Sequence, residues 1–485
     1  MATQLAEAGI LQGNRPKSRW WALAFLALAQ FMVVLDGTIV NLALPRLQIE
    51  MGITDSTRSW VVTAYALAFG AFLLLGGRIA DFWGRKRTFI VAAVGFAAAS
   101  LLGGIAQQPW ELIGARALQG VFAALLAPAA LALLTVAFPG GKDRGTAFAV
   151  FGSITGVGAA AGVLLGGFLT EHVSWRWCFF VNVPIALIAL AGVWSLVSES
   201  RAQGSTRYDW PGVVLAALGL GSLVYGFTNA EHGWDAPEAW GFIAAGAALL
   251  VLFVVVERKV RHPLLPLRVA TERNRGAAFL ASFLSGAVLI GGILFINFYI
   301  QIVLGFAPFL AGLASLPMTV AVLITAGLVA KNLPKLGAKI PTAAGPVFMA
   351  AAMLWLSRVS AEGSYLVNML PALLLMGAGL GMVFVPMQNL ALFGVDRDDS
   401  GVASALVNAS QQIGGSLGIA LFSTIAAAAT AGGVSLAALS TGYATVFLWA
   451  AGVAILIAPI ALLLITIDRR TFTGTGGDAP VVHLG

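Results

Sequence analysis

Long apolar runs, each followed by a short polar segment, recur along almost the whole chain. A helix needs about 20 consecutive apolar residues to cross the hydrocarbon core of a bilayer. The pattern predicts fourteen such helices, over residues 20–44, 58–76, 88–106, 112–137, 147–169, 177–197, 210–229, 239–256, 277–301, 309–330, 341–357, 366–393, 402–430 and 443–467. The predicted fold class is therefore an all-α integral membrane protein.

The composition excludes a soluble protein. Of 485 residues, 59% are hydrophobic and 10% are charged, whereas a soluble domain has about 45–50% apolar and roughly 25% charged residues. The polar segments between the runs are too short to fold as separate domains. Cys178 is the only cysteine, and His172, His232, His262 and His483 lack the spacing of metal ligands. We expect no disulfide within the chain, no metal site and no cofactor.

The basic residues predict the orientation in the membrane. An even number of spans puts both termini on one side, and short cytoplasmic loops are enriched in Lys and Arg. With cytoplasmic termini, 23 of the 28 Lys and Arg residues lie in cytoplasmic segments, and the outer segments hold only Arg46, Arg58, Arg176 and Arg358. The net charge of +7 is thus a signal of topology, and we expect no nucleic-acid partner. The first apolar run is long and no cleavage site follows it, so we interpret it as a retained span.

The spacing of the runs predicts six spans, an additional pair, and six more spans. The expected segments are an N-terminal tail at 1–19, a first bundle at 20–197, a linker at 198–209, the additional pair at 210–256, a basic linker at 257–276, a second bundle at 277–467 and a disordered tail at 468–485. The basic linker would lie near anionic lipid headgroups.

Only two ionisable residues lie well inside the predicted spans, Asp36 in the first and Arg116 in the fourth. A charge at a helix centre costs ~2.5–3.5 kcal/mol on insertion scales, so we expect both residues to face a polar partner or a water-filled cavity. Burial favours a neutral carboxyl group whereas a cation favours the carboxylate, so a proton and a cationic ligand would compete for Asp36. Such competition is the simplest physical basis for antiport. The alternative is a structural carboxylate bound to backbone or to a neighbouring helix.

Arg116 shares a helix face with Gln119 and Gly120, and alanines continue this face. Another helix can therefore approach closely, and Arg116 can act on the carboxyl group of Asp36 or hold a chain of water molecules. The alternative is an arginine that extends to the outer membrane interface, because Arg116 lies near the start of its predicted span.

The segment GGRIADFWGRKR at 76–87 resembles the signature loop of the major facilitator superfamily. We expect Gly77 and Gly84 to allow a tight turn, Asp81 to pair with an arginine or a helix N-terminus, and Arg85 and Lys86 to stay cytoplasmic. Phe82 departs from the pattern, because a basic residue is usual there.

Further motifs are similar to those of the fourteen-span drug:proton antiporter family within that superfamily. They are LDGTIVNLALP (35–45), RALQG (116–120), WRWCFFVNVP (175–184), RHPLLPLR (261–268) and GVASALVNASQQIGGSLGIA (401–420). The resemblance implies a major facilitator fold of two six-helix bundles plus two additional helices. It also implies proton coupling at Asp36 and Arg116, and gating of the cytoplasmic side at Asp81.

The fifth span carries a stripe of small residues. Gly158, Gly162 and Gly166 recur every four residues, and GVLLGG, which ends at Gly167, resembles the antiporter motif of the family with Val163 in the place of proline. Such a stripe permits close helix contact and sliding between helices. A simple packing seam is an equally good interpretation.

Amide side chains and one aromatic ring within the spans suggest where cargo could bind. The candidates are Asn41, Gln119, Asn297, Phe298, Gln301, Gln388, Asn389, Asn408, Gln411 and Gln412. A cavity with such a lining would suit a bulky, largely apolar ligand with a few hydrogen-bonding groups. Alternatively, these amides hold helices together.

Together these features predict a proton-coupled antiporter that exports lipophilic drugs or antibiotics, neutral or singly cationic, by alternating access. We expect a monomer in a bacterial cytoplasmic membrane whose partners are its small lipophilic substrate, protons and membrane lipids. An enzyme is disfavoured because the spans contain no cluster of His, Cys or carboxylate side chains. Alternatives are an exporter or flippase of an endogenous lipid or natural product, and a membrane sensor that transports nothing.

Overall fold

The computed structural model describes residues 16–139, 141–201, 209–230, 237–260, 263–395, 400–430 and 433–467. Within these ranges all regular structure is helical and no strand occurs. The tail expected at 468–485 lies outside the described residues, as does most of the tail expected at 1–19 and of the linker expected at 198–209.

Among the described residues, fourteen segments are long and apolar enough to cross a membrane, which confirms the predicted number of spans. Some helices extend past their apolar runs because polar residues continue or cap them. The last span, predicted from residue 443, begins at Leu436, where the Ser435 side chain accepts from Ala438 N at 3.2 Å. The α-helices are α2 (Pro16–Met51), α3 (Asp55–Trp83), α4 (Arg85–Ile105), α5 (Pro109–Ala137), α6 (Gly141–His172), α7 (Trp177–Phe180), α8 (Asn182–Leu196), α9 (Trp210–Asn229), α10 (Pro237–Glu257), α11 (Leu267–Ala270), α12 (Arg273–Gly286), α13 (Gly292–Phe298), α14 (Pro308–Leu336), α15 (Lys339–Leu356), α16 (Leu370–Leu392), α17 (Ser400–Thr430), α18 (Leu436–Ile455) and α19 (Ile457–Leu464).

Several spans are not uniform α-helices. The part of the chain that the structure describes also contains three π-helical segments, which are rare and often occur at functional sites: η2 (Ala287–Gly291), η3 (Tyr299–Val303) and η4 (Tyr365–Met369). The span predicted at 277–301 consists of α12, η2, α13 and η3. The span predicted at 177–197 is divided at Val181, so that Asn182 is the first residue of α8.

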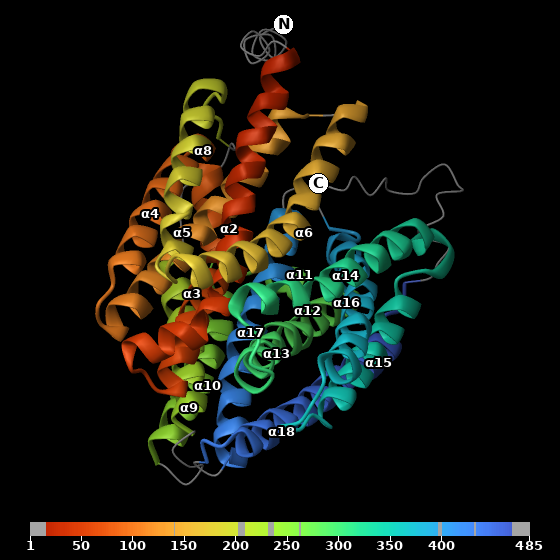
Figure 1. Cartoon of the computed structure of the whole chain (residues 1–485). Helices are drawn as coiled ribbons and strands as arrows, with labels where there is room; N and C mark the ends of the chain where they lie inside the picture. Colours follow the sequence, from red (N-terminus) through yellow and green to blue (C-terminus); the bar gives the residue numbers. More distant parts are fainter. Residues whose placement is uncertain are drawn as a thin grey trace, which may run out of the picture.

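The spans form two halves with a helix pair beside them. In Figure 1, α2 to α8 run from red to yellow, and α12 to α19 run from green to blue. The halves meet mainly where α3 packs on α17 and where α6 packs on α14. Helix α10 packs on α9, which in turn packs on both α3 and α17. The pair α9–α10 therefore lies at the junction of the halves.

Two names are used below for the faces of the bundle. The terminal face is the one at which α2 begins and α3 ends, and the far face is the one at which α2 ends and α3 begins. Because the number of spans is even, the last span also ends at the terminal face.

Two buried carboxylates hold the linker that follows α10. Asp209 caps α9, where it accepts from Gly212 N at 2.9 Å, and its other oxygen accepts from Leu264 N at 3.4 Å. Glu257 accepts from Leu265 N at 3.0 Å. The bonds fasten the start of the linker to the helix pair at the terminal face.

Candidate functional site

The two charges predicted inside the membrane form a buried ion pair. Arg116 Nη1 on α5 lies 2.7 Å from Asp36 Oδ2 on α2, and the two side chains are 1% and 0% exposed. The guanidinium also donates from Nε to the carbonyl oxygen of Val61 at 2.9 Å and lies over the ring of Tyr65. Arg116 therefore does not extend to the membrane interface, and each charge has the polar partner that a low-dielectric interior requires.

Two amide side chains complete the environment of Asp36. Gln119 Nε2 donates to Asp36 Oδ1 at 2.9 Å, and Asn182 Nδ2 donates to the same oxygen at 2.7 Å. Gln119 Oε1 accepts from Arg116 Nη1 at 2.9 Å, and Gln119 Nε2 also donates to Ser100 Oγ at 2.8 Å. We refer to Asp36, Ser100, Arg116, Gln119 and Asn182 as the Asp36 network; four helices contribute to it, and every member is buried.

The network is built for a charged carboxylate. Asp36 accepts three hydrogen bonds from side chains, one of them from a cation. The cation contacts Oδ2 and the two amides contact Oδ1, so both oxygens of the carboxylate have a donor inside the membrane.

Asn182 and Ser100 are members that the sequence analysis did not identify. Uncharged polar residues are frequent in membrane helices, so neither residue stands out from its own segment. Asn182 lies within the motif WRWCFFVNVP, and its place at the start of α8 turns its amide toward α2. That motif was the only available signal.

The loop between α3 and α4 is held by a residue outside the signature motif. Glu199 accepts from Lys86 N and Arg87 N, each at 3.1 Å, and so caps α4. A Cβ atom at Gly84, whose φ is +132°, would lie 2.9 Å from the Glu199 carboxyl group. Arg85 Nη2 lies 2.9 Å from Asp81 Oδ1, so Asp81 pairs with an arginine.

Gly77 does not take part in the turn, contrary to expectation. It lies inside α3, which continues to Trp83, and a Cβ atom there would make only an ordinary contact with Pro128 at 3.8 Å. The close approach occurs one residue earlier, because a Cβ atom at Gly76 would clash with the backbone of Ala124. Of the two expected glycines, only Gly84 has a positive φ and forms the turn.

The glycines of α6 pack against the helix that carries Asp36. A Cβ atom at Gly158 would lie 3.2 Å from the Val34 side chain, and Cβ atoms at Gly162 and Gly166 would clash with α2 itself. Gly167 faces α14 of the other half instead. The stripe is thus a packing seam on α2 that ends at a contact between the halves.

Contacts between the halves also join them toward the far face. The guanidinium of Arg58 on α3 lies over the ring of Phe298, with Cζ 3.7 Å from the ring centroid. Next to it, the hydroxyl groups of Ser59 and Ser423 are hydrogen-bonded at 2.9 Å. Arg58 and Phe298 are both buried. These contacts must separate if the far face is to open.

The cargo-site candidates are distributed over several depths. Gln119 belongs to the Asp36 network, and Asn41 is half-buried on α2. Asn297, Phe298 and Gln301 lie toward the far face, where Gln301 Nε2 has no partner among the described residues.

The remaining candidates lie deeper in the second half or near the terminal face. Asn389 donates to Val385 O at 2.8 Å and Asn408 to Ser404 O at 3.2 Å, each within its own helix. Gln388 precedes Asn389 on α16, and Gln411 and Gln412 lie in the middle of α17, where Gln412 packs near Gly70 of the other half. Among the described residues, no hydrogen bond joins two of these amides.

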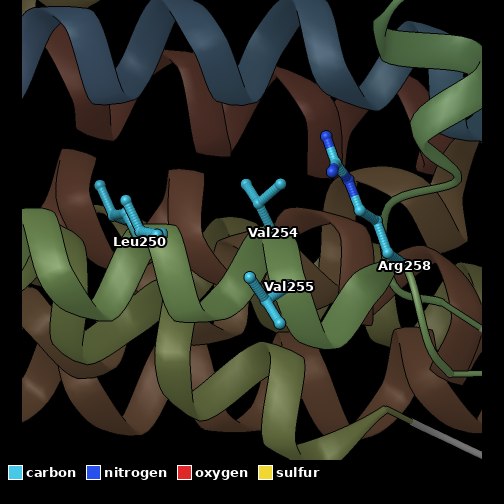
Figure 2. A pocket seen from close by; sticks show the side chains of 5 residues that line it. Leu250, Val254, Val255 and Arg258 are labelled. Atoms are coloured by element: carbon cyan, nitrogen blue, oxygen red, sulfur yellow. The ribbon is translucent and has the colours of Figure 1, made fainter.

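A shallow apolar groove lies on the outer side of α10, away from the Asp36 network. It is lined by Leu250, Val251, Val254, Val255 and Arg258, and Figure 2 shows Leu250 and Val254 on one side of the helix with Arg258 at its end. No member of the network lines the groove. Among the described residues, no group of three or more His, Cys, Asp and Glu side chains is placed to hold a metal ion.

Comparison with known proteins identifies the family. A model of the Major Facilitator Superfamily matches residues 26–419. The chain is 44% identical over 477 residues to the puromycin resistance protein of Streptomyces alboniger, and the aligned region covers 96% of this chain and 94% of the relative. It is 36% identical over 467 residues to the cephamycin export protein of Amycolatopsis lactamdurans, and the aligned region covers 95% of this chain and 96% of the relative.

The solved structures agree on the fold. A bacterial homolog of the human lysosomal transporter Spinster, in an inward-facing and unoccupied conformation, superposes with a TM-score of 0.66 at 14% identity and covers 95% of this chain and 98% of that chain. Fourteen spans and bacterial relatives indicate a multi-pass protein of the bacterial cytoplasmic membrane. The chain belongs to the Major Facilitator Superfamily, with antibiotic resistance and export proteins among its relatives.

Proposed function

We propose that the protein exports lipophilic antibiotics or drugs across the cytoplasmic membrane in exchange for protons. The observation that carries the proposal is the ion pair of Asp36 and Arg116, whose side chains are 0% and 1% exposed. A buried ionisable pair inside a membrane bundle is costly and is by default a functional hypothesis. A network used only for packing would not need a charge on either helix.

The coupling follows from the bonds of Asp36. Protonation removes the negative charge that Arg116 Nη1 contacts at 2.7 Å, so the attraction between α2 and α5 is lost. The freed guanidinium keeps its bond to Val61 O and can turn toward cargo or toward the other half. The proton and the cargo would thereby exclude each other through the network.

We place the terminal face in the cytoplasm, because that orientation satisfies the positive-inside rule. The structure then corresponds to a state closed at the outer face by Arg58, Phe298, Ser59 and Ser423. In the opposite state, Asp36 would take up a proton from outside as cargo leaves. Movement of one charge down the membrane potential supplies ~2.3 kcal/mol per 100 mV.

The relatives support the class of cargo. One is named for resistance to puromycin and the other for export of cephamycin. A divalent cation would have to replace Arg116 beside a single carboxylate and would leave one positive charge unpaired inside the membrane. We therefore expect neutral or singly cationic cargo, and poor export of divalent cations. We also infer that a single chain suffices, since all members of the network belong to it.

Reconstitution in liposomes with an imposed pH gradient tests the proposal. In liposomes with an acidic lumen, wild-type protein should accumulate puromycin against its concentration gradient. The lumenal pH should rise as protons leave in exchange. The Asp36→Asn variant should bind puromycin but lose gradient-driven movement. Movement that ignores the gradient in the wild type, or coupling that is unchanged in Asp36→Asn, would contradict proton antiport at this residue.

A further inference from the structure

The amide of Asn182 uses only one of its two polar atoms. Nδ2 donates to Asp36 Oδ1 at 2.7 Å, whereas Oδ1 is buried and has no hydrogen-bond partner among the described residues. An unpaired buried acceptor is unfavourable, so such atoms usually have an explanation in function or strain. This one lies beside the carboxyl group on which the proposed coupling depends.

Gln119, whose side-chain amide also bonds to Asp36, is different because both its carbonyl oxygen and its NH₂ group form hydrogen bonds. Its Oε1 accepts from Arg116, and its Nε2 donates to Asp36 and to Ser100. If this amide turned over, its NH₂ group would face the guanidinium, donor against donor. Gln119 is therefore held in one orientation, whereas the Asn182 amide has no second bond to lose when it turns.

Protonation changes what Asp36 requires of its neighbours. A carboxylate only accepts hydrogen bonds, but a carboxylic acid also has an O–H donor that needs an acceptor. Arg116 provides donors only, Gln119 Oε1 already accepts from Arg116, and Ser100 Oγ already accepts from Gln119. Within the network as described, Asn182 Oδ1 is the acceptor that carries no bond.

We propose that Asn182 is a positioning residue that turns its side-chain amide when Asp36 takes up a proton. Nδ2 donates to the carboxylate in the state of this structure, and Oδ1 accepts from the O–H of the protonated acid. The proton stays on Asp36, and only the torsion next to the amide changes, which is soft for an sp³–sp² bond. Both charge states of Asp36 are then hydrogen-bonded inside the membrane. This inference rests on the proposed role of Asp36 in coupling and adds a residue to it.

Infrared difference spectra between acid and alkaline pH test the turn directly. The experiment uses full-length protein in lipid, with unlabelled and isotope-labelled asparagine, and assigns bands with Asn182→Ser and Asp36→Asn. We expect acidification to produce a carboxylic-acid band that is absent in Asp36→Asn. With it, the Asn182 carbonyl band should move to lower frequency as this oxygen gains a hydrogen bond, and this shift should be absent in both variants.

The two possible failures are distinguishable. If the carboxylic-acid band appears but the Asn182 carbonyl band does not move, the amide does not turn and the inference is overturned while proton binding at Asp36 stands. If no carboxylic-acid band assignable to Asp36 appears, the proposed function fails first. Both bands are measured in the wild-type protein, and the two variants serve only to assign them.

Transport by variants gives a second test. Asn182→Leu keeps the approximate shape but removes donor and acceptor, so proton-driven puromycin efflux should fall about tenfold. Asn182→Ser restores a hydroxyl group that can both donate and accept, and should recover most of the rate. Asn332→Leu is the matched control, because the Asn332 amide bonds only to Leu328 O of its own exposed helix turn. Equal rates in Asn182→Leu and wild type would overturn the inference.

Discussion

The hydroxyl oxygens of Ser59 on α3 and Ser423 on α17 lie 2.9 Å apart, across the junction of the two halves. Both side chains are buried, next to the stack of Arg58 on Phe298. If alternating access separates these helices, a covalent bond between the two positions must hold the far face closed. In the Ser59→Cys/Ser423→Cys variant, oxidation should reduce transport about tenfold or more, and reduction should restore it.

Cys178 must be removed first so that the two new thiols are the only ones. Its side chain is buried and makes only long contacts, to Thr170 Oγ1 at 3.6 Å and to Gly166 O at 4.0 Å, so Cys178→Ala should be tolerated. Each single cysteine variant is a control, because oxidation should leave its transport unchanged. Full transport with the disulfide quantitatively formed would show that the far face does not need to open here.

Arg116→Leu should destabilise the protein far more than the change in side-chain size would. Removal of one partner of a buried pair leaves the Asp36 carboxylate without its cation and typically costs about 3–5 kcal/mol. In the double variant with Asp36→Asn, both charges are gone, so much of the loss should be recovered. Thermal unfolding of the four proteins in detergent gives the coupling free energy. Additive losses from the two single substitutions would mean that the pair contributes no stability to the fold.

Asp36, Arg116 and Gln119, which shares a helix face with Arg116, could be predicted from the sequence, whereas Asn182 and Ser100 could not. Asp36 and Arg116 stand out because ionisable residues are rare in apolar spans. Asn182 and Ser100 resemble many other polar residues in membrane helices, and their roles depend on which helix faces α2, which no local pattern contains. For the same reason the number of spans was predictable from hydropathy, whereas the packing of α9 on both α3 and α17 was not.

The signature loop shows the same limit at another place. Its motif predicts the pairing of Asp81 with an arginine, and the turn at Gly84 brings Asp81, near the end of α3, next to Arg85, the first residue of α4. It contains no sign of Glu199, which lies more than a hundred residues away and reaches the loop only when α8 packs on α4. The motif also predicts a role for Gly77 in the turn, but α3 continues through this residue to Trp83.

Glu199→Ala should loosen the start of α4. The variant removes the acceptor for Lys86 N and Arg87 N, and loss of such a cap costs about 0.5–2 kcal/mol. Glu199→Gln keeps an acceptor oxygen and should lose less. Amide hydrogen exchange at residues 85–89 measures the effect, with exchange at the start of α5 as the internal reference. Unchanged protection of these amides in Glu199→Ala would show that Glu199 does not stabilise the loop.

The glycine seam between α6 and α2 provides the last prediction. A Cβ atom at Gly166 would clash with the backbone of Ile39, one turn of α2 beyond Asp36, so Gly166→Ala must push the two helices apart. Overpacking of this kind costs about 1–3 kcal/mol. Gly152, on the same helix, has nothing within 4 Å of the position of a Cβ atom. Gly152→Ala should therefore be neutral or stabilise the helix by up to about 1 kcal/mol.

Stability and coupling should change together in this pair of variants. Displacement of α2 moves Asp36 away from Arg116 and Asn182, so Gly166→Ala should lower proton-driven transport as well as the melting temperature, while Gly152→Ala changes neither unfavourably. Thermal unfolding and liposome transport measured on the same preparations decide between the two uses of the seam. If Gly166→Ala lowers stability but leaves the proton-to-puromycin ratio and the rate intact, the seam supports the fold and does not position Asp36.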